Sequence, residues 1–415
     1  MRLHTWVISA VALGVIAGCG GSSSSSNSKN GRTNPNPISK LPFRAFVANN
    51  FQKVLHIVDE TKDQLYTFTS SSFVTPIAGN IPITEATVGV SAGPVALAAA
   101  GTGITIVVTQ DATGNGLSFI DNAQESQKSA AALPGAVSSV VGTPDGKTAY
   151  AAVPTSDAVY AVNIADGSLA ATIGVPNGQR LVMSPDGSKV LAFSRNRNFF
   201  TIIKTADNTT QQVTGFDAML YGVISSDNSK AYVLNCGPQC SGTTPASVSV
   251  VDLTAAAPAL GSSVTVAGAT VGTIDSSGNL YVAGSPASGA LQGVLSVVST
   301  AGPTISKTAQ IGDGLHTIMV QHPNGKIYIG AQNCSNQPAI ANSGCLSVYT
   351  PSANTATVDQ ARGNVTGIQP VNAKGRNVTY VTVGGQFLIY DGTTDQPQTN
   401  QIPLTGQITD VRSAQ

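Results

Sequence analysis

The sequence predicts an all-β protein built as a β-propeller, and three observations support this prediction. The 415-residue chain has only 10% charged residues but 43 glycines, a composition that disfavours long helices and suits short strands joined by tight turns. One sequence unit recurs along most of the chain every 40 to 50 residues or so, roughly the period of propeller blades. Within each unit, short apolar segments alternate with turn sequences rich in Gly, Pro, Asn and Asp.

The clearest copy of the unit begins with the turn Pro144-Asp145-Gly146 and continues through apolar segments at 148–153, 158–164 and 169–173. In such a turn Pro fixes φ, Asp accepts hydrogen bonds from the backbone that follows, and Gly tolerates a positive φ. This turn chemistry explains Asp145, and equally Asp186 in the next copy. We therefore interpret both carboxylates as turn residues rather than as catalytic acids.

The number of blades follows from one apolar or aromatic residue that marks the second strand of each unit. These residues are Phe46, Ile106, Tyr150, Leu191, Tyr232, Tyr281, Tyr328 and Tyr380. They predict eight four-stranded blades, with seven as the alternative if the degenerate second unit belongs to a neighbour. The first unit lacks an inner strand, whereas a strand-like segment at 407–412 has no unit of its own. We expect this C-terminal strand to complete the first blade and close the ring, which removes an exposed strand edge.

Charge and hydrophobicity exclude two classes of protein. Lys and Arg together number 21, as do Asp and Glu, so the formal net charge is zero. A nucleic-acid-binding protein usually carries a basic patch, and we expect no nucleic-acid partner here. Hydrophobic residues make up 41% of the chain, enough to form a packed core and to exclude a wholly disordered protein.

The N-terminal segment has the features of an export signal. Arg2 precedes an apolar stretch from Trp6 to Ala17 that is too short to span a bilayer. The segment Ile16-Ala17-Gly18-Cys19 resembles the lipobox of bacterial lipoproteins, which implies cleavage before Cys19 and lipidation of its thiol. The alternative is an ordinary secretory signal with an incidental cysteine.

Three regions follow from this interpretation. Residues 1–18 are the signal peptide, 19–41 are the lipidated Cys19 and a flexible tether rich in Gly, Ser and Asn, and 42–415 are the propeller. Position 20 is Gly rather than the Asp that resembles an inner-membrane retention signal. We therefore expect a lipid-anchored protein of the cell envelope, at the periplasmic or the surface face of the outer membrane.

The four remaining cysteines form two pairs that are close in sequence, Cys236 with Cys240 and Cys334 with Cys345. Export places them in an oxidising compartment, where such pairs are expected to form disulfides. The alternative is a four-thiolate zinc site, but these spacings are not those of usual zinc ligands. We expect two local disulfides, no metal and no cofactor.

The repeat units resemble the YVTN family of propeller repeats, which is related to the lactonase-like propellers. The matching words are Pro-Asp-Gly-Lys-Thr-Ala-Tyr (144–150), Lys-Ala-Tyr-Val (230–233), Asn-Leu-Tyr-Val (279–282) and Ser-Val-Val-Asp (249–252). The resemblance covers approximately residues 43–415. It implies the propeller fold, and it raises a lactonase-like activity as one hypothesis without identifying a substrate.

A candidate site lies on the face that carries the loops between second and third strands. These loops are long at 111–116, 236–246, 285–293 and 334–345, and they include both cysteine pairs. They either shape a binding surface or are tolerated insertions stabilised for life outside the cell. We expect the mouth of the channel on this face to be ringed by residues that can bind a small anion or polar ligand: Gln179, Arg180, Tyr221, Asp313, His316 and Asp410. The alternative is that a water-filled channel simply tolerates polar groups.

The sequence offers few catalytic motifs. There is no H-E-x-x-H or P-loop pattern. The favoured hypothesis is therefore a non-catalytic, lipid-anchored scaffold that binds a protein or glycan partner at the bacterial cell envelope. The alternative is a lactonase-like hydrolase or lyase with Arg180, His316 and Asp410 as its channel residues, so whether the protein is an enzyme stays open.

Overall fold

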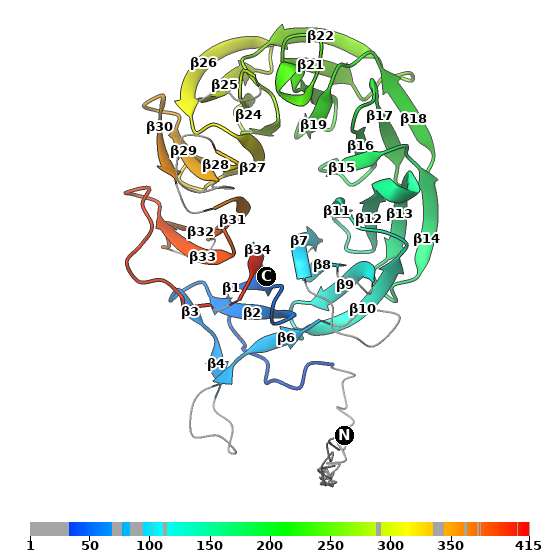
Figure 1. Ribbon diagram of the computed structural model, residues 1–415. Helices are drawn as coiled ribbons and strands as arrows, with labels where there is room; N and C mark the ends of the chain where they lie inside the picture. The colour runs from blue at the N-terminus through cyan, green and yellow to red at the C-terminus, as the bar shows by residue number, and fades with distance from the viewer. Residues whose placement is uncertain are drawn as a thin grey trace, which may run out of the picture.

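The protein is an eight-bladed β-propeller whose blades surround a central axis (Figure 1). The structure, a computed structural model, describes residues 33–68, 77–83, 94–101, 103–110, 114–287, 292–334, 344–360, 363–371, 373, 375–404 and 406–414. Each blade is an antiparallel sheet whose first strand lies at the axis and whose last strand lies at the rim. The predicted count of eight blades, rather than seven, is confirmed.

The first four blades occupy the N-terminal half of the chain. Blade 1 has β34 (Ile408–Ser413), β1 (Arg44–Asn49), β2 (Val54–Asp59) and β3 (Gln64–Leu65), and β6 (Asn80–Pro82) also pairs with β2. Blade 2 has β7 (Pro94–Ala100), β8 (Ile104–Gln110), β9 (Asn115–Asp121) and β10 (Ser126–Leu133). Blade 3 has β11 (Ser139–Gly142), β12 (Thr148–Val153), β13 (Ala158–Asn163) and β14 (Leu169–Gly174), with the 3-10 turn η1 (Pro154–Ser156) before β13. Blade 4 has β15 (Gly178–Met183), β16 (Lys189–Ser194), β17 (Phe199–Lys204) and β18 (Thr210–Thr214).

The remaining four blades follow in chain order. Blade 5 has β19 (Met219–Ile224), β20 (Lys230–Asn235), β21 (Ser247–Asp252) and β22 (Leu260–Thr265), with the 3-10 turn η2 (Gly237–Cys240) before β21. Blade 6 has β23 (Val271–Ile274), β24 (Asn279–Gly284), β25 (Gly293–Ser299) and β26 (Thr304–Ile311). Blade 7 has β27 (Leu315–Gln321), β28 (Ile327–Gln332), β29 (Cys345–Thr350) and β30 (Thr355–Gln360). Blade 8 has β31 (Val365–Pro370), β32 (Val378–Val383) and β33 (Gln386–Asp391), and a small sheet of β4 (Thr67–Phe68) and β5 (Ile77–Ala78) lies beside blade 1.

The eight residues that predict second strands all lie in second strands, and all are buried. A second strand is covered on both faces because blades pack face to face, so it has continuous burial rather than the alternation of a half-exposed strand. In β12, for example, residues 149–153 are all buried. One apolar cluster joins Ile106 and Phe119 of blade 2 to Ala149 and Ala151 of blade 3.

The C-terminal strand closes the ring as predicted. β34 pairs antiparallel with β1, with Phe46 opposite Arg412 and Val47 opposite Val411. The innermost strand of blade 1 therefore comes from the end of the chain and its other strands from the beginning. This closure pairs the inner edge of β1, which would otherwise be exposed.

The rim of blade 8 departs from the regular four-stranded pattern, since its sheet has three strands in the described part of the chain. Beyond β33, Tyr390 forms an isolated bridge with Pro397, and the Gln398 backbone N–H donates to the Ile389 carbonyl at 2.8 Å. The Gln401 side chain accepts from the Ile389 N–H, also at 2.8 Å. A side chain therefore replaces part of the backbone pairing at this edge.

The Pro-Asp-Gly turns have the predicted chemistry. Oδ1 of Asp145 accepts hydrogen bonds from the Thr143 hydroxyl at 2.6 Å and the Lys147 N–H at 3.1 Å, and Gly146 has φ of 69°. The hydrogen bond from Thr143 is the main reason why the pKa of Asp145 is lowered. These carboxylates hold turns together.

The described chain begins inside the segment assigned to the tether, and residues there contact the propeller. The Asn34 side chain donates to the Glu125 carbonyl at 2.6 Å, and the Ser39 N–H donates to the Glu125 carboxylate at 2.7 Å. The Ser39 hydroxyl donates to the same carboxylate. Glu125 is fully buried and such a carboxylate needs hydrogen-bond donors, so residues 34–39 lie along blade 2.

Candidate functional site

Both predicted disulfides are present, between Cys236 and Cys240 and between Cys334 and Cys345. Asp313 lies beside Cys334 and Cys345 in a group with the size of a metal site. The two sulfur atoms are bonded to each other, however, and a metal requires thiolates. The disulfides also indicate an exported, non-cytoplasmic protein.

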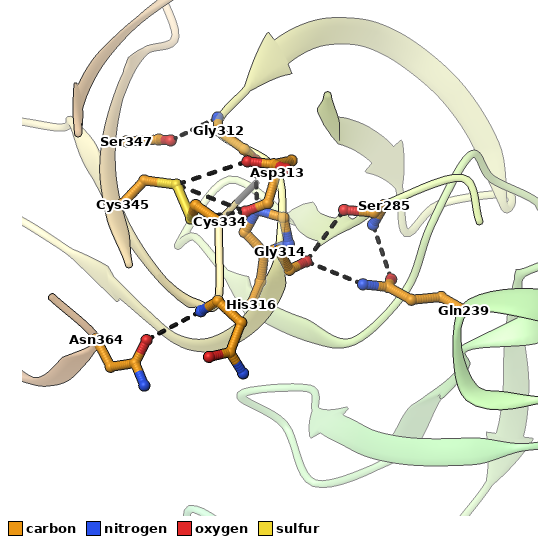
Figure 2. The surroundings of a disulfide bond; sticks show 11 residues. Gln239, Ser285, Gly312, Asp313, Gly314, His316, Cys334, Cys345, Ser347 and Asn364 are labelled. Atoms are coloured by element: carbon orange, nitrogen blue, oxygen red, sulfur yellow. Dashed lines mark hydrogen bonds between the residues drawn. A yellow bond between two sulfur atoms is a disulfide. The ribbon is translucent and has the colours of Figure 1, made fainter. Parts of the chain in front are cut away.

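The disulfide of blade 5 holds a short turn, η2, that reaches over blade 6 to blade 7. Gln239 lies in this turn, and its side-chain amide donates to the Gly314 carbonyl at 2.9 Å and accepts from the Ser285 N–H at 2.8 Å. The Ser285 hydroxyl donates to the same Gly314 carbonyl at 3.0 Å (Figure 2). One glutamine therefore links three consecutive blades at the mouth of the channel.

The disulfide of blade 7 packs against the other side of the same segment. Cys334 Sγ lies 3.1 Å from the carbonyl oxygen of Asp313, and the Gly312 N–H donates to the Ser347 hydroxyl at 3.0 Å (Figure 2). The Asn333 N–H donates to the Asn364 side chain at 2.9 Å, which extends the link to blade 8. Segment 312–317 is thus fixed between the two disulfides. The rest of the 334–345 loop, at 335–343, lies outside the described residues.

A cavity of about 480 Å³ opens beside this segment on the loop face. Its polar lining comes from inner strands and from loops between second and third strands, and includes Gln179, Arg180, Arg195, Asn196, Gln239 and Thr317. Its apolar lining includes Met219, Leu220 and Leu315. The volume is within the range of small-molecule sites, about 300 to 1,000 Å³.

Arg180 forms the inner wall of this cavity. Both terminal nitrogens of its guanidinium donate to a single acceptor, the Thr317 carbonyl, each at 3.3 Å. The contact runs from β15 of blade 4 to β27 of blade 7, so the side chain reaches across the axis of the ring. The guanidinium carbon also lies 5.5 Å from the ring centroid of Tyr221, a cation–π distance.

The electrostatics of the cavity are strongly asymmetric. Arg180 and Arg195 line it, and no described residue in its lining is an aspartate or a glutamate. No ion pair joins either arginine to a carboxylate within the described ranges. Burial lowers the pKa of Arg180, although a guanidinium stays charged at neutral pH. The described lining therefore has a positive charge without a carboxylate to balance it, in a chain that is neutral overall.

His316 lies behind the wall of the channel and not in the cavity lining. Its side chain is fully buried, and its Nε2 lies 2.8 Å from the Gly312 carbonyl, to which it donates. Nδ1 has no hydrogen-bond partner within the described part of the protein. Burial lowers the pKa of His316 to about 4, so the ring is neutral at pH 7. Its position fixes segment 312–316.

Asp410 joins the closing strand to blade 2. Its carboxylate accepts from the Leu97 N–H at 2.9 Å and lies 3.6 Å from the Arg412 guanidinium. A Cβ on Gly367 would lie 2.3 Å from Oδ1 of this carboxylate, so the glycine permits close packing here. Burial is the main reason why the pKa of Asp410 is raised.

The predicted ring of polar residues is thus divided among separate environments. Gln179 and Arg180 line the cavity and Tyr221 stacks against Arg180, whereas Asp313 belongs to the disulfide surroundings. Among the described contacts, no hydrogen bond or ion pair joins any two of Arg180, His316 and Asp410.

Arg195, Gln239 and Thr317 are among the cavity-lining residues that sequence reasoning missed. Arg195 could have been predicted from the sequence, because it begins the loop Arg-Asn-Arg-Asn at 195–198 in a chain with few charges. Thr317 could not have been predicted in this way, since it contacts Arg180 through its backbone carbonyl.

A second cavity, of about 450 Å³, lies on the opposite face between blades 3 and 4. Its carboxylates, Asp145 and Asp186, are occupied by hydrogen bonds within their own turns. The loop face is therefore the better candidate for recognition. Within the described residues, no helix has the length and apolarity needed to cross a membrane.

Comparison with known proteins identifies the fold but no family. No family model matches the chain, and no curated protein matches it by sequence. Dihydro-heme d1 dehydrogenase NirN in complex with DHE aligns with a TM-score of 0.62 and 13% identity, over 92% of this chain and 79% of that chain. The Dos1 propeller aligns with a TM-score of 0.58 and 11% identity, over 79% and 87%. AztD from Citrobacter koseri aligns with a TM-score of 0.54 and 11% identity, over 89% and 97%. Identities this low show a common fold and leave the activity to be argued from the site.

Proposed function

We propose that the chain is an exported, lipid-anchored binding module of the bacterial cell envelope, and that its recognition surface is the loop face around the cavity. One observation carries this proposal: two disulfide-held loops converge on segment 312–317 at the edge of that cavity. A binding site gains affinity when its groups are ordered before the ligand arrives, because less conformational entropy is lost on binding. Here η2 and the described residues beside the Cys334–Cys345 bond are held by covalent bonds and by hydrogen bonds that cross blades.

The location of the disulfides argues for a role in recognition. They close short loops, with sequence separations of 4 and 11 residues, and short loops contribute least to global stability in the chain-entropy account. Both lie on the cavity face, and none of the described residues on the turn face is held in this way. Local rigidity at one surface is therefore their main effect.

Export and anchoring are the parts of this proposal that rest on the N-terminal sequence. The segment Ile16-Ala17-Gly18-Cys19 supports lipidation at Cys19, and Gly20 supports the outer membrane. The YVTN assignment likewise remains a prediction from repeat words. The partner we propose is a protein or a glycan of the envelope.

The test is cross-linking in intact cells followed by mass spectrometry of the mature protein and whatever it captures. We expect a stoichiometric envelope partner whose cross-links map to 236–246 and to the exposed Leu315. A variant with all four of Cys236, Cys240, Cys334 and Cys345 changed to Ser should keep the far-ultraviolet circular dichroism of a β-protein and lose the partner.

Two results would contradict the proposal. One is a partner whose cross-links map to the turn face, around 144–147 and 185–188. The other is unchanged capture by the four-serine variant in a folded state. The lactonase-like alternative has only the sequence resemblance behind it, since no described contact brings its three named residues together.

A further inference from the structure

The loop-face cavity has an unbalanced positive charge. Arg180 and Arg195 line it without any aspartate or glutamate among the described lining residues. A half-buried guanidinium loses hydration, and its usual compensation in a folded protein is a carboxylate or phosphate partner. Among the described residues, the hydrogen-bond acceptor of the Arg180 guanidinium is instead the Thr317 carbonyl, at 3.3 Å from each of two nitrogens, which is longer than a charge-assisted hydrogen bond. The Arg180 guanidinium therefore lacks an anionic partner in the part of the chain that the structure describes.

The fold holds the Arg180 side chain and the Arg195 backbone in place. Stacking on Tyr221 and the contact with Thr317 fix the plane of the Arg180 guanidinium. Arg195 follows β16 directly, and its backbone is tied on both sides: its N–H donates to the Asn177 carbonyl at 3.1 Å, and its own carbonyl accepts from the Asn177 side chain at 2.8 Å. A planar fork of N–H donors at a fixed orientation matches the two oxygens of a carboxylate.

The lining also offers apolar surface. Met219, Leu220 and Leu315 contribute it, beside polar side chains such as Gln179 and Gln239. A ligand that uses both kinds of surface has a negatively charged head at the arginines and an apolar body against these three side chains, whereas a purely inorganic ion leaves the apolar side chains uncovered.

We propose that this cavity binds a small organic carboxylate, with the carboxylate held by Arg180 and Arg195 and the apolar body against Met219, Leu220 and Leu315. The inference deepens the proposed binding function and rests on the same cavity. It goes further by naming the ligand class. The anionic head supplies the counter-charge that the described lining lacks, and the guanidinium of Arg180 exchanges a weak carbonyl contact for a charge-assisted one.

The test is isothermal titration calorimetry of the full mature protein in detergent, with hexanoate as the probe. Hexanol and hexylamine have the same apolar body with a neutral or a positive head, and inorganic phosphate has a negative head without a body. We expect binding of hexanoate, no detectable binding of the alcohol or the amine, and weaker binding of phosphate.

Variants assign the binding to the two arginines. Loss of a charged hydrogen-bond partner should weaken hexanoate binding by about tenfold or more in both Arg180→Gln and Arg195→Gln. Arg197→Gln is the matched control, because Arg197 has the same charge in the same loop but does not line the cavity; its affinity should stay within about twofold. Arg195 is exposed, so its variant tests the proposal even if Arg180→Gln destabilises the fold.

Three results would overturn the inference: equal binding of hexanol, tighter binding of phosphate than of hexanoate, or an equal effect of Arg195→Gln and Arg197→Gln. Failure here is distinguishable from failure of the proposed function. An envelope partner cross-linked at 236–246 with no carboxylate binding refutes the ligand class alone, whereas carboxylate binding without any partner on the loop face refutes the envelope scaffold.

Discussion

Replacement of Glu60 by Gln is expected to remove a specific pH dependence of stability. Glu60 follows β2 and is fully buried where the closing strand meets blade 1. The Ser413 hydroxyl donates to its Oε1, and Oε2 has no hydrogen-bond partner among the described residues. Burial raises the pKa of Glu60 from 4.5 to about 7, with a further increase from the nearby Asp59 and a decrease from the Ser413 hydrogen bond.

The magnitude and its sign follow from linkage. The folded protein holds the proton on Glu60 more tightly than the unfolded chain does, so this contribution to stability is complete below pH 4.5 and is lost as pH rises to about 7. At about 1.4 kcal/mol for each pKa unit, the carboxyl costs the folded protein about 3 kcal/mol once it is ionised. Glutamine is neutral at every pH and has the same shape, so the variant should not lose this energy.

The assay is denaturant unfolding followed by far-ultraviolet circular dichroism, between pH 4 and pH 8, on the wild type and the Glu60→Gln variant. The difference in unfolding free energy should be near zero at pH 4 and should grow in favour of the variant by up to about 3 kcal/mol at pH 8. Asp207→Asn is a control for which the pH dependence of stability has the opposite sign. Hydrogen bonds from Thr209 lower the pKa of Asp207, so loss of this carboxylate should lower stability at high pH. A difference for Glu60→Gln that is flat with pH would refute the reasoning.

Three further predictions concern closure, packing and protonation. Deletion of residues 407–415 removes β34 and exposes the edge of β1, so we expect aggregation in size-exclusion chromatography, and a monomeric β-protein would contradict this. Gly222→Ala should lower the denaturant midpoint, because the new Cβ would lie 2.4 Å from the Phe193 ring and overpacking costs about 1 to 3 kcal/mol; an unchanged midpoint would show that the core adjusts freely. The His316 ring should titrate near pH 4 by NMR, since burial lowers its pKa to about 4, and stability should fall as the pH drops from 6.5 toward 4; a midpoint near 6.5 would place the ring in solvent.

Much of the fold was predictable from local patterns. A second strand buried on both faces has an apolar or aromatic centre, and for this reason Phe46 and Tyr380 at opposite ends of the chain identify blades 1 and 8. The first unit lacks an inner strand and the C-terminal strand has no unit of its own, so the sequence predicts that the C-terminal strand completes blade 1. The rim of blade 8 was not predictable in this way, because Gln401 replaces backbone pairing with a side-chain contact.

The site was predictable only in part, because its contacts join segments far apart in sequence. The starts of the inner strands predicted Gln179 and Arg180 for the loop face, and both residues line the cavity there. The reach of Arg180 to the Thr317 carbonyl, and of Gln239 over blade 6, depends on the diameter of the ring, which no local pattern encodes. Contacts of the segment before Phe43 likewise depend on Glu125, which lies in another blade.

Site-specific photo-cross-linking in living cells tests most directly the claim that the loop face is the recognition surface. A photoreactive residue at Arg197, on the loop face, should capture one envelope partner. The same residue at Ser188, an exposed position in a turn on the opposite face, should capture none. Capture from Ser188 but not from Arg197, or equal capture from both, would contradict the account.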